Sequence, residues 1–134
     1  MLSIKKILDF YIKNNDEEYF YENINAKYKN NTYVFNIEND KYEIKVDNKI
    51  ILKKENNESL LEFIFDENKE TNATYYIKEL DFYMDAKINT IYTKKEVDIV
   101  VEYKLTLQDE EIGNFIFKLK DKEWVYGRYK RRII

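Results

Sequence analysis

Hydrophobic and polar residues alternate one by one along much of the chain. In the stretch 80–88 one face carries Leu80, Phe82, Met84, Ala86 and Ile88, and the other carries mainly charged or polar side chains. Residues 97–107 and 115–119 repeat this rhythm, and shorter examples lie at 33–37, 42–46, 50–52 and 61–65. A helix would place neighbours two apart on nearly opposite sides, whereas a strand places them on one face. The pattern therefore predicts β-strands that bury their apolar face.

The turns between these segments are predicted to use asparagine and aspartate. The chain has no proline and only two glycines, Gly113 and Gly127, while Asn/Asp clusters recur mostly about 8 to 16 residues apart. Asparagine and aspartate tolerate left-handed backbone better than other non-glycine residues. Gly113 itself is expected to mark a β-bulge or a close approach of the backbone to a neighbouring side chain.

Consecutive strands joined by short turns are antiparallel neighbours, and closing such a sheet removes its exposed edges. We therefore expect an all-β fold, a single antiparallel up-and-down barrel of about eight strands over residues 1–123, followed by a short tail, 124–134. The segment 2–12 fits two patterns. Ile4, Ile7, Leu8, Tyr11 and Ile12 suit a helical stripe, whereas Leu2, Ile4, Leu8, Phe10 and Ile12 suit a strand.

Composition removes several classes of chemistry. The 134 residues include no cysteine and no histidine, which excludes disulfides, thiol nucleophiles, imidazole catalysis and the usual zinc sites. No phosphate-binding loop or nucleophile elbow is present. The acidic turns 16–18 and 109–111 lack the glycine of a calcium loop. We predict no cofactor, no metal and no catalytic residue.

One enzymatic alternative stays open, a carboxylate-dependent hydrolase. The carboxylate pairs Glu79/Asp81 and Asp81/Asp85 lie on a common strand face. Because that face is the polar one, it is expected to be a solvated outer wall. The hypothesis requires at least two carboxylates that face the interior of the barrel.

The C-terminal tail differs from the rest in charge. The chain has a net charge of −3, and removing the four cations of the tail, −3 minus 4, leaves −7 for the body. The aromatic residues Trp124, Tyr126 and Tyr129 interleave with those cations, Arg128, Lys130, Arg131 and Arg132. Aromatic rings stack on bases while cations contact phosphate, so an RNA- or ribosome-associated role is one hypothesis. Docking on an acidic protein or an anionic membrane surface, or simple packing on the barrel, are the alternatives.

The second half of the chain resembles a known family. The stretches SLLEFIFDENKETNATYYI, ELDFYMDAKINTIY and VDIVVEYKLTLQDEEIGNFIFKLK, between about residues 59 and 120, are similar to the YwiB-like bacterial proteins. In that family an alternating strand leads through an acidic turn into an Ile-Gly pair and a last strand. Here these are Ile99, Val101, Tyr103 and Leu105, then Ile112-Gly113, then Phe115, Phe117 and Leu119. The resemblance implies a calycin-like (lipocalin-like) β-barrel, and it implies no activity.

A barrel of about eight strands has an interior that side chains fill or that holds one small ligand. Tyr42, Tyr76 and Tyr103 are our candidates for lining that interior and binding a small apolar or aromatic ligand. The leading hypothesis is a non-enzymatic module that binds such a ligand, or a protein partner, at one mouth of the barrel. No uncharged run approaches the roughly 18 residues of a membrane-spanning helix, and no signal peptide is evident, so a cytoplasmic location is expected.

Overall fold

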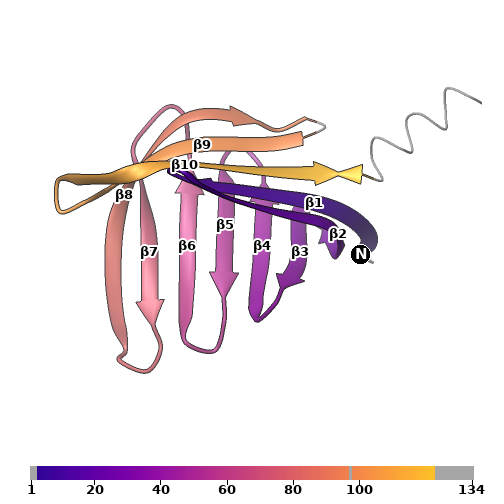
Figure 1. Ribbon diagram of the computed structural model, residues 1–134, viewed down its shortest axis with the longest axis horizontal. Helices are drawn as coiled ribbons and strands as arrows, with labels where there is room; N and C mark the ends of the chain where they lie inside the picture. The colour runs from indigo at the N-terminus through magenta and orange to yellow at the C-terminus, as the bar shows by residue number, and fades with distance from the viewer. Residues whose placement is uncertain (1–2, 97, 123–134) are drawn as a thin grey trace, which may run out of the picture.

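The computed structural model describes residues 3–96 and 98–122, and it shows ten antiparallel strands (Figure 1). They are β1 (Ile4–Asn14), β2 (Glu17–Lys29), β3 (Thr32–Ile37), β4 (Asp40–Val46), β5 (Ile50–Glu55), β6 (Ser59–Phe65), β7 (Thr71–Ile77), β8 (Phe82–Lys94), β9 (Asp98–Leu107) and β10 (Glu110–Asp121). Each strand pairs with its neighbours in sequence, and β10 pairs with β1 to close the barrel. In the described part of the chain, no helix has the length and apolar character needed to cross a membrane.

The predicted all-β antiparallel barrel is confirmed, but it has ten strands rather than eight. The segment that fitted both a helix and a strand is β1. Two strands are not revealed by alternation, β2 and β7. In β2 the cause is a β-bulge, with Asn23 at a φ of 55°, opposite the segment between Leu8 and Phe10 of β1. Tyr21 and Ile24, three positions apart, therefore both face inward. The bulge shifts the alternation by one residue, so the strand shows no continuous period of two.

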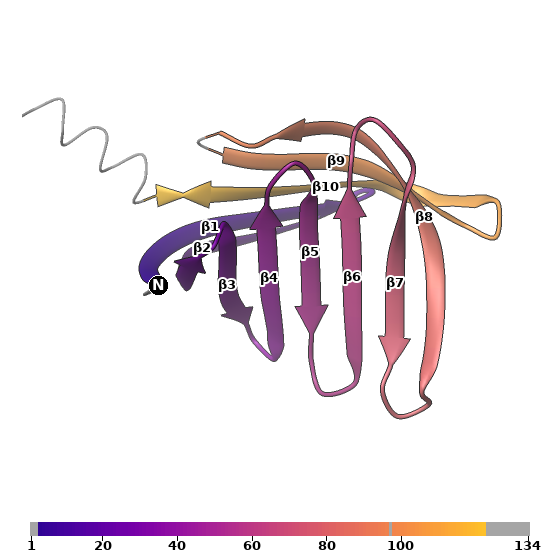
Figure 2. The same cartoon turned by 180° about the vertical axis from the view of Figure 1, so that it is seen from behind.

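The barrel is flattened into two walls that cross one another. Figures 1 and 2 show β3 to β7 running side by side, with β1, β9 and β10 crossing over them. The 13-residue strands β2 and β8 belong to both walls, because β2 lies between β1 and β3 and β8 between β7 and β9. The interior between the walls is the hydrophobic core.

The core consists of the inward-facing residues of alternating strands. Its fully buried side chains are Leu8, Phe10, Phe35, Ile44, Ile50, Phe65, Ile88, Val101 and Leu119. Each such burial contributes about 1.5–3 kcal/mol of transfer free energy. The predicted inward face of residues 99–107 and 115–119 is therefore found, with Tyr103 and Phe117 also buried, while Val97 lies outside the described residues.

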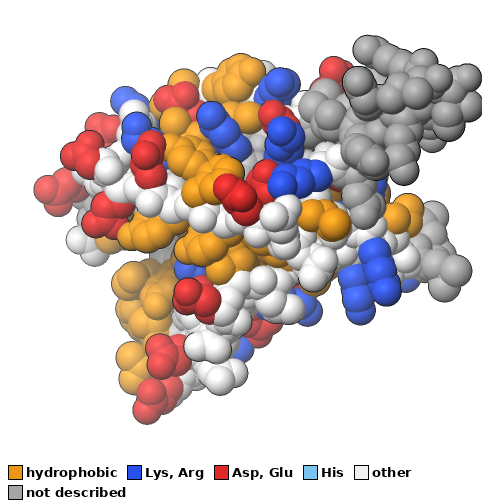
Figure 3. All heavy atoms as spheres, turned by 45° about the vertical axis from the view of Figure 1, so that its right-hand side comes forward, with side chains coloured by type: hydrophobic (Ala, Val, Ile, Leu, Met, Phe, Trp, Pro, Cys, Tyr) orange, Lys and Arg blue, Asp and Glu red, His pale blue; other side chains and the backbone are white. Residues whose placement is uncertain are grey.

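The start of β8 departs from this rule. Leu80, Phe82 and Met84 share the predicted apolar face with the buried Ile88, yet they are 69%, 50% and 40% exposed. The β7–β8 hairpin runs downward in Figure 1 while the β9–β10 hairpin runs to the side, so no opposite wall covers its tip. In Figure 3, hydrophobic side chains lie exposed along the lower left of the molecule, above acidic side chains at the lower tip.

Candidate functional site

The two ends of the barrel are built from different turns. One end is bounded by the turns 15–16, 38–39, 56–58, 78–81 and 108–109, and we call it the cavity mouth. The other end, which we call the plugged end, is bounded by the turns 30–31, 47–49 and 66–70, by the connection from β8 to β9, and by the outer ends of β1 and β10. Interior side chains at the cavity mouth are mainly apolar, whereas those at the plugged end include charged groups. The candidate site is the apolar interior of the cavity mouth.

An aromatic cavity of about 210 Å³ lies inside the cavity mouth. Aromatic and aliphatic side chains form nearly all of its wall, and two polar side chains, Asn14 and Lys54, complete it. The apolar lining residues are Phe10, Ile12, Tyr42, Leu52, Leu61, Phe63, Tyr103, Leu105, Phe115 and Phe117. An apolar cavity of about 150 Å³ is already large enough for a benzene ring, so this one has room for a substituted ring.

Two tyrosines, Tyr42 and Tyr103, contribute phenol hydroxyls to the cavity wall. Tyr42 and Tyr103 are only 5% and 7% exposed. The Tyr42 ring stacks on Phe35 with centroids 5.2 Å apart, and the Tyr103 ring stacks on Phe115 at 5.4 Å. Burial raises the pKa of both phenols well above the usual tyrosine value, so both hydroxyls are protonated.

Neither hydroxyl donates a hydrogen bond to any described residue, and neither oxygen is among the fully buried atoms that lack a partner. Both hydroxyl oxygens therefore have accessible surface although their rings are packed in the wall. The two groups are therefore placed to receive hydrogen bonds from, or donate them to, a molecule in the cavity.

A lysine–aspartate pair lies at the edge of the cavity. The Lys54 ammonium is 3.6 Å from the Asp40 carboxylate and 5.9 Å from the centroid of the Tyr42 ring. Both side chains are partly exposed, at 36% for Lys54 and 26% for Asp40. This geometry shows that the face of Tyr42 accepts a cation next to a carboxylate.

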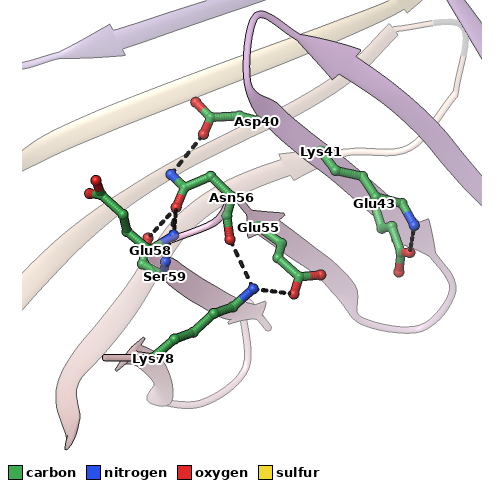
Figure 4. A network of polar contacts seen from close by, with 8 residues as sticks. All are labelled: Asp40, Lys41, Glu43, Glu55, Asn56, Glu58, Ser59 and Lys78. Carbon is green, nitrogen blue, oxygen red and sulfur yellow. Dashed lines mark hydrogen bonds and ion pairs between the residues drawn. The ribbon is translucent and has the colours of Figure 1, made fainter. Parts of the chain in front are cut away.

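A hydrogen-bond network fixes the rim beside this pair (Figure 4). The Asn56 side-chain amide donates to Asp40 at 2.9 Å, and its oxygen accepts from the backbone amides of Glu58 and Ser59 at 2.8 and 2.9 Å. The Lys78 ammonium donates to the Asn56 carbonyl at 2.9 Å and to Glu55 at 2.8 Å, and this bond holds the pKa of Glu55 below its usual value. Three turns of the mouth are thus tied together.

A second hollow, acidic rather than aromatic, lies outside this rim. It measures about 310 Å³ and is lined by Glu38, Asn39, Asp40, Asn56, Asn57 and Glu58. It adjoins the aromatic cavity at Asp40, whose partner Lys54 lines the cavity. A molecule that fills the cavity and extends past Lys54 would therefore meet carboxylates.

The plugged end contains an ionic cluster. Asp121, only 4% exposed, lies 3.3 Å from the Lys6 ammonium and accepts a hydrogen bond from the Tyr33 hydroxyl at 3.1 Å. Burial, together with the Asp121 charge, raises the pKa of Tyr33. The Lys6 ammonium also lies 5.8 Å from the Tyr28 ring. These groups contact one another at this end of the barrel.

The structure separates the predicted ligand-binding residues. Tyr42 and Tyr103 line the cavity, but Tyr76 does not. On β7 the inward face carries Ala73, so Tyr76, three positions on, is on the outside. There it stacks on Tyr83 at 4.4 Å and donates to Asp81 at 2.8 Å. The predicted interior position of Tyr76 is wrong, because a tyrosine fits either face of a strand whose alternation is weak.

The other predicted residues stand as follows. The tail residues Trp124, Arg128, Lys130, Arg131 and Arg132 lie outside the described residues, so their predicted partner-binding role stays a prediction. No carboxylate occurs among the described residues that line the aromatic cavity, so the cavity lacks the pair that the hydrolase hypothesis required. The sequence reading missed Lys54, although its spacing of two from the inward-facing Leu52 places it on the same face.

Comparison with known proteins identifies the fold. The structure is similar to the crystal structure of the ywiB protein from Bacillus subtilis, with a TM-score of 0.51 and 12% sequence identity over 89% of this chain and 91% of that chain. No family model matches the sequence, and no curated protein does either. The expected YwiB-like barrel is therefore confirmed as a fold.

Proposed function

We propose that this chain, a barrel of the YwiB-like fold, is a non-enzymatic binding protein that holds a small ligand with an apolar ring in its aromatic cavity. One observation carries the proposal: the rings of Tyr42 and Tyr103 are packed into the cavity wall, while their hydroxyl oxygens keep accessible surface and have no hydrogen-bond partner among the described residues. A ring flanked by Phe63 and Phe115 with a polar substituent toward the hydroxyls satisfies both surfaces.

The rim is consistent with a binding site. The network around Asn56 ties the turns of the cavity mouth to one another. A preformed pocket lowers the entropic cost of binding. The wall offers hydroxyls, an amide and one ammonium, which orient a ligand.

The test is a titration with 2-phenylethanol, a neutral ring with a short polar arm. Binding is monitored through the NMR signals of the backbone amides. We expect saturable one-to-one binding that shifts the amides of residues lining the cavity. Leu105→Trp should abolish it, because the indole fills the cavity, since Leu105 lies in its wall. The matched control is Leu80→Trp, the same exchange at a 69% exposed turn position, which should bind normally. Absence of binding to the unaltered protein, or binding that survives in Leu105→Trp, contradicts the proposal.

A further inference from the structure

The cavity mouth is strongly acidic. Its five turns hold the carboxylates Asp16, Glu38, Glu58, Glu79, Asp81 and Asp109 against the single lysine Lys78, so six minus one gives a charge of −5. The described turns of the plugged end, 30–31, 47–49, 66–70 and 95–96, hold five carboxylates and three lysines, a charge of −2. Charges of one sign around an opening raise the local concentration of ligands of the opposite sign.

The nearest carboxylates adjoin the cavity itself. Asp40 contributes both to the acidic hollow and, through its ion pair with Lys54, to the edge of the aromatic cavity. Glu38 and Glu58 line the same hollow. Their position is independent of the unpaired hydroxyls of Tyr42 and Tyr103, so two separate features of the site point to a ligand.

The Lys54 ammonium shows how a cation would sit there. It rests against the Tyr42 ring with Asp40 as counter-ion, and it belongs to the protein's own chain. Its side chain is 36% exposed, so an incoming ammonium that took this position would leave Lys54 in contact with solvent. Because Asp40 neutralises Lys54, this lysine gives an incoming carboxylate little net attraction, and Glu38 and Glu58 repel it.

From these contacts we infer that the ligand of the aromatic cavity is a small organic cation, an amine whose ring enters the cavity while its ammonium lies at Tyr42 and Asp40 and faces the acidic hollow. This inference rests on the proposed function. It adds the charge of the ligand, which an aromatic wall alone does not determine. Cation–π contact and nearby carboxylates together favour the ammonium over an uncharged group of the same shape.

The experiment compares three probes of similar shape, 2-phenylethylamine, 2-phenylethanol and phenylacetate, titrated into the full chain at low ionic strength. We expect the amine to bind about tenfold more tightly than the alcohol, with phenylacetate the weakest. Added salt should reduce this preference, because it screens the acidic rim. If the alcohol or phenylacetate binds as tightly as the amine, the inference is wrong while the binding function stands. If none of the three binds, both fail.

Charge variants locate the effect. Glu38→Gln should weaken the amine several-fold and leave the alcohol unchanged. Glu70→Gln is its matched control, because both glutamates are exposed turn residues and Glu70 lies at the plugged end. Lys54→Met should strengthen amine binding by removing the competing ammonium. A weaker amine in Lys54→Met, or equal effects of Glu38→Gln and Glu70→Gln, would contradict the placement at the acidic hollow.

Discussion

At the scale of single residues, the contact between Gly113 and Asn15 shows why one glycine is needed in a chain that has so few. Asn15 follows β1 with a φ of 55°, and its side-chain oxygen accepts a hydrogen bond from the Asn114 backbone amide at 3.0 Å. Its backbone amide donates to the Asn114 carbonyl at 2.9 Å. The Asn15 amide group consequently occupies the space in which a Cβ atom at position 113 would lie.

Gly113→Ala should destabilise the fold by about 1–3 kcal/mol, because the new methyl group must displace a side chain held by hydrogen bonds. Urea unfolding followed by circular dichroism measures this loss. The control is Asn15→Gly, which keeps the left-handed backbone possible and removes the obstructing side chain. In the double variant the cost of Gly113→Ala should largely disappear, and an undiminished cost would show that the overlap with Asn15 is not its origin.

The sequence allowed several of these residue positions to be predicted. Gly113 was expected at a bulge or a close approach, and the structure confirms both, with a register shift between Glu111 and Gly113. Six of the eight described positive-φ residues are Asn or Asp, as the turn clusters indicated. Glu38 and Gln108 are the other two, and composition gave no signal for them because neither type favours left-handed backbone.

At the scale of the elements, alternation identifies strands that have one buried face along their whole length. It fails for β2, because a bulge divides its inward side chains between two phases. It also placed Phe82 and Met84 inside, since a period of two gives the face of a strand but not where the opposite wall ends. The same limit applies to the cavity residues. Tyr42 and Tyr103 were placed correctly because their strands alternate clearly, whereas Tyr76 was misplaced because β7 does not.

The rim network joins elements that are distant in sequence, and Asn56 is its centre. Asn56→Ala removes one donated and several accepted hydrogen bonds among β4, β5 and β6. We expect a loss of about 2 kcal/mol in the free energy of unfolding, together with weaker probe binding because the mouth becomes less ordered. The neighbouring exposed residue supplies the control, since Asn57→Ala should change neither the free energy of unfolding nor the affinity for 2-phenylethanol, whose cavity Asn57 does not line. Equal effects of the two exchanges would rule out a special role for Asn56.

At the scale of the whole molecule, the interiors of the two ends of the barrel differ. The interior of the plugged end holds Lys6, Asp121 and Tyr33, which contact one another. The cavity mouth instead leaves two hydroxyls unpaired, among the described residues, in a wall of rings. Under the proposed function the ligand enters at the cavity mouth, so the charge of its turns would favour a cation.

The ionic cluster at the plugged end should affect the free energy of unfolding without affecting the affinity of the aromatic cavity. Lys6→Met should cost about 3 kcal/mol in the free energy of unfolding, because it removes an ammonium that faces the buried Asp121 carboxylate. The control is Lys5→Met, an exposed lysine on the same strand, which should be nearly neutral. Adding Asp121→Asn to Lys6→Met should recover part of the loss, since it removes the buried charge. The affinity for 2-phenylethanol should stay unchanged in the folded Lys6→Met protein, because the two sites lie at opposite ends of the barrel. A variant that loses affinity while it is still folded would show that the plug also shapes the cavity.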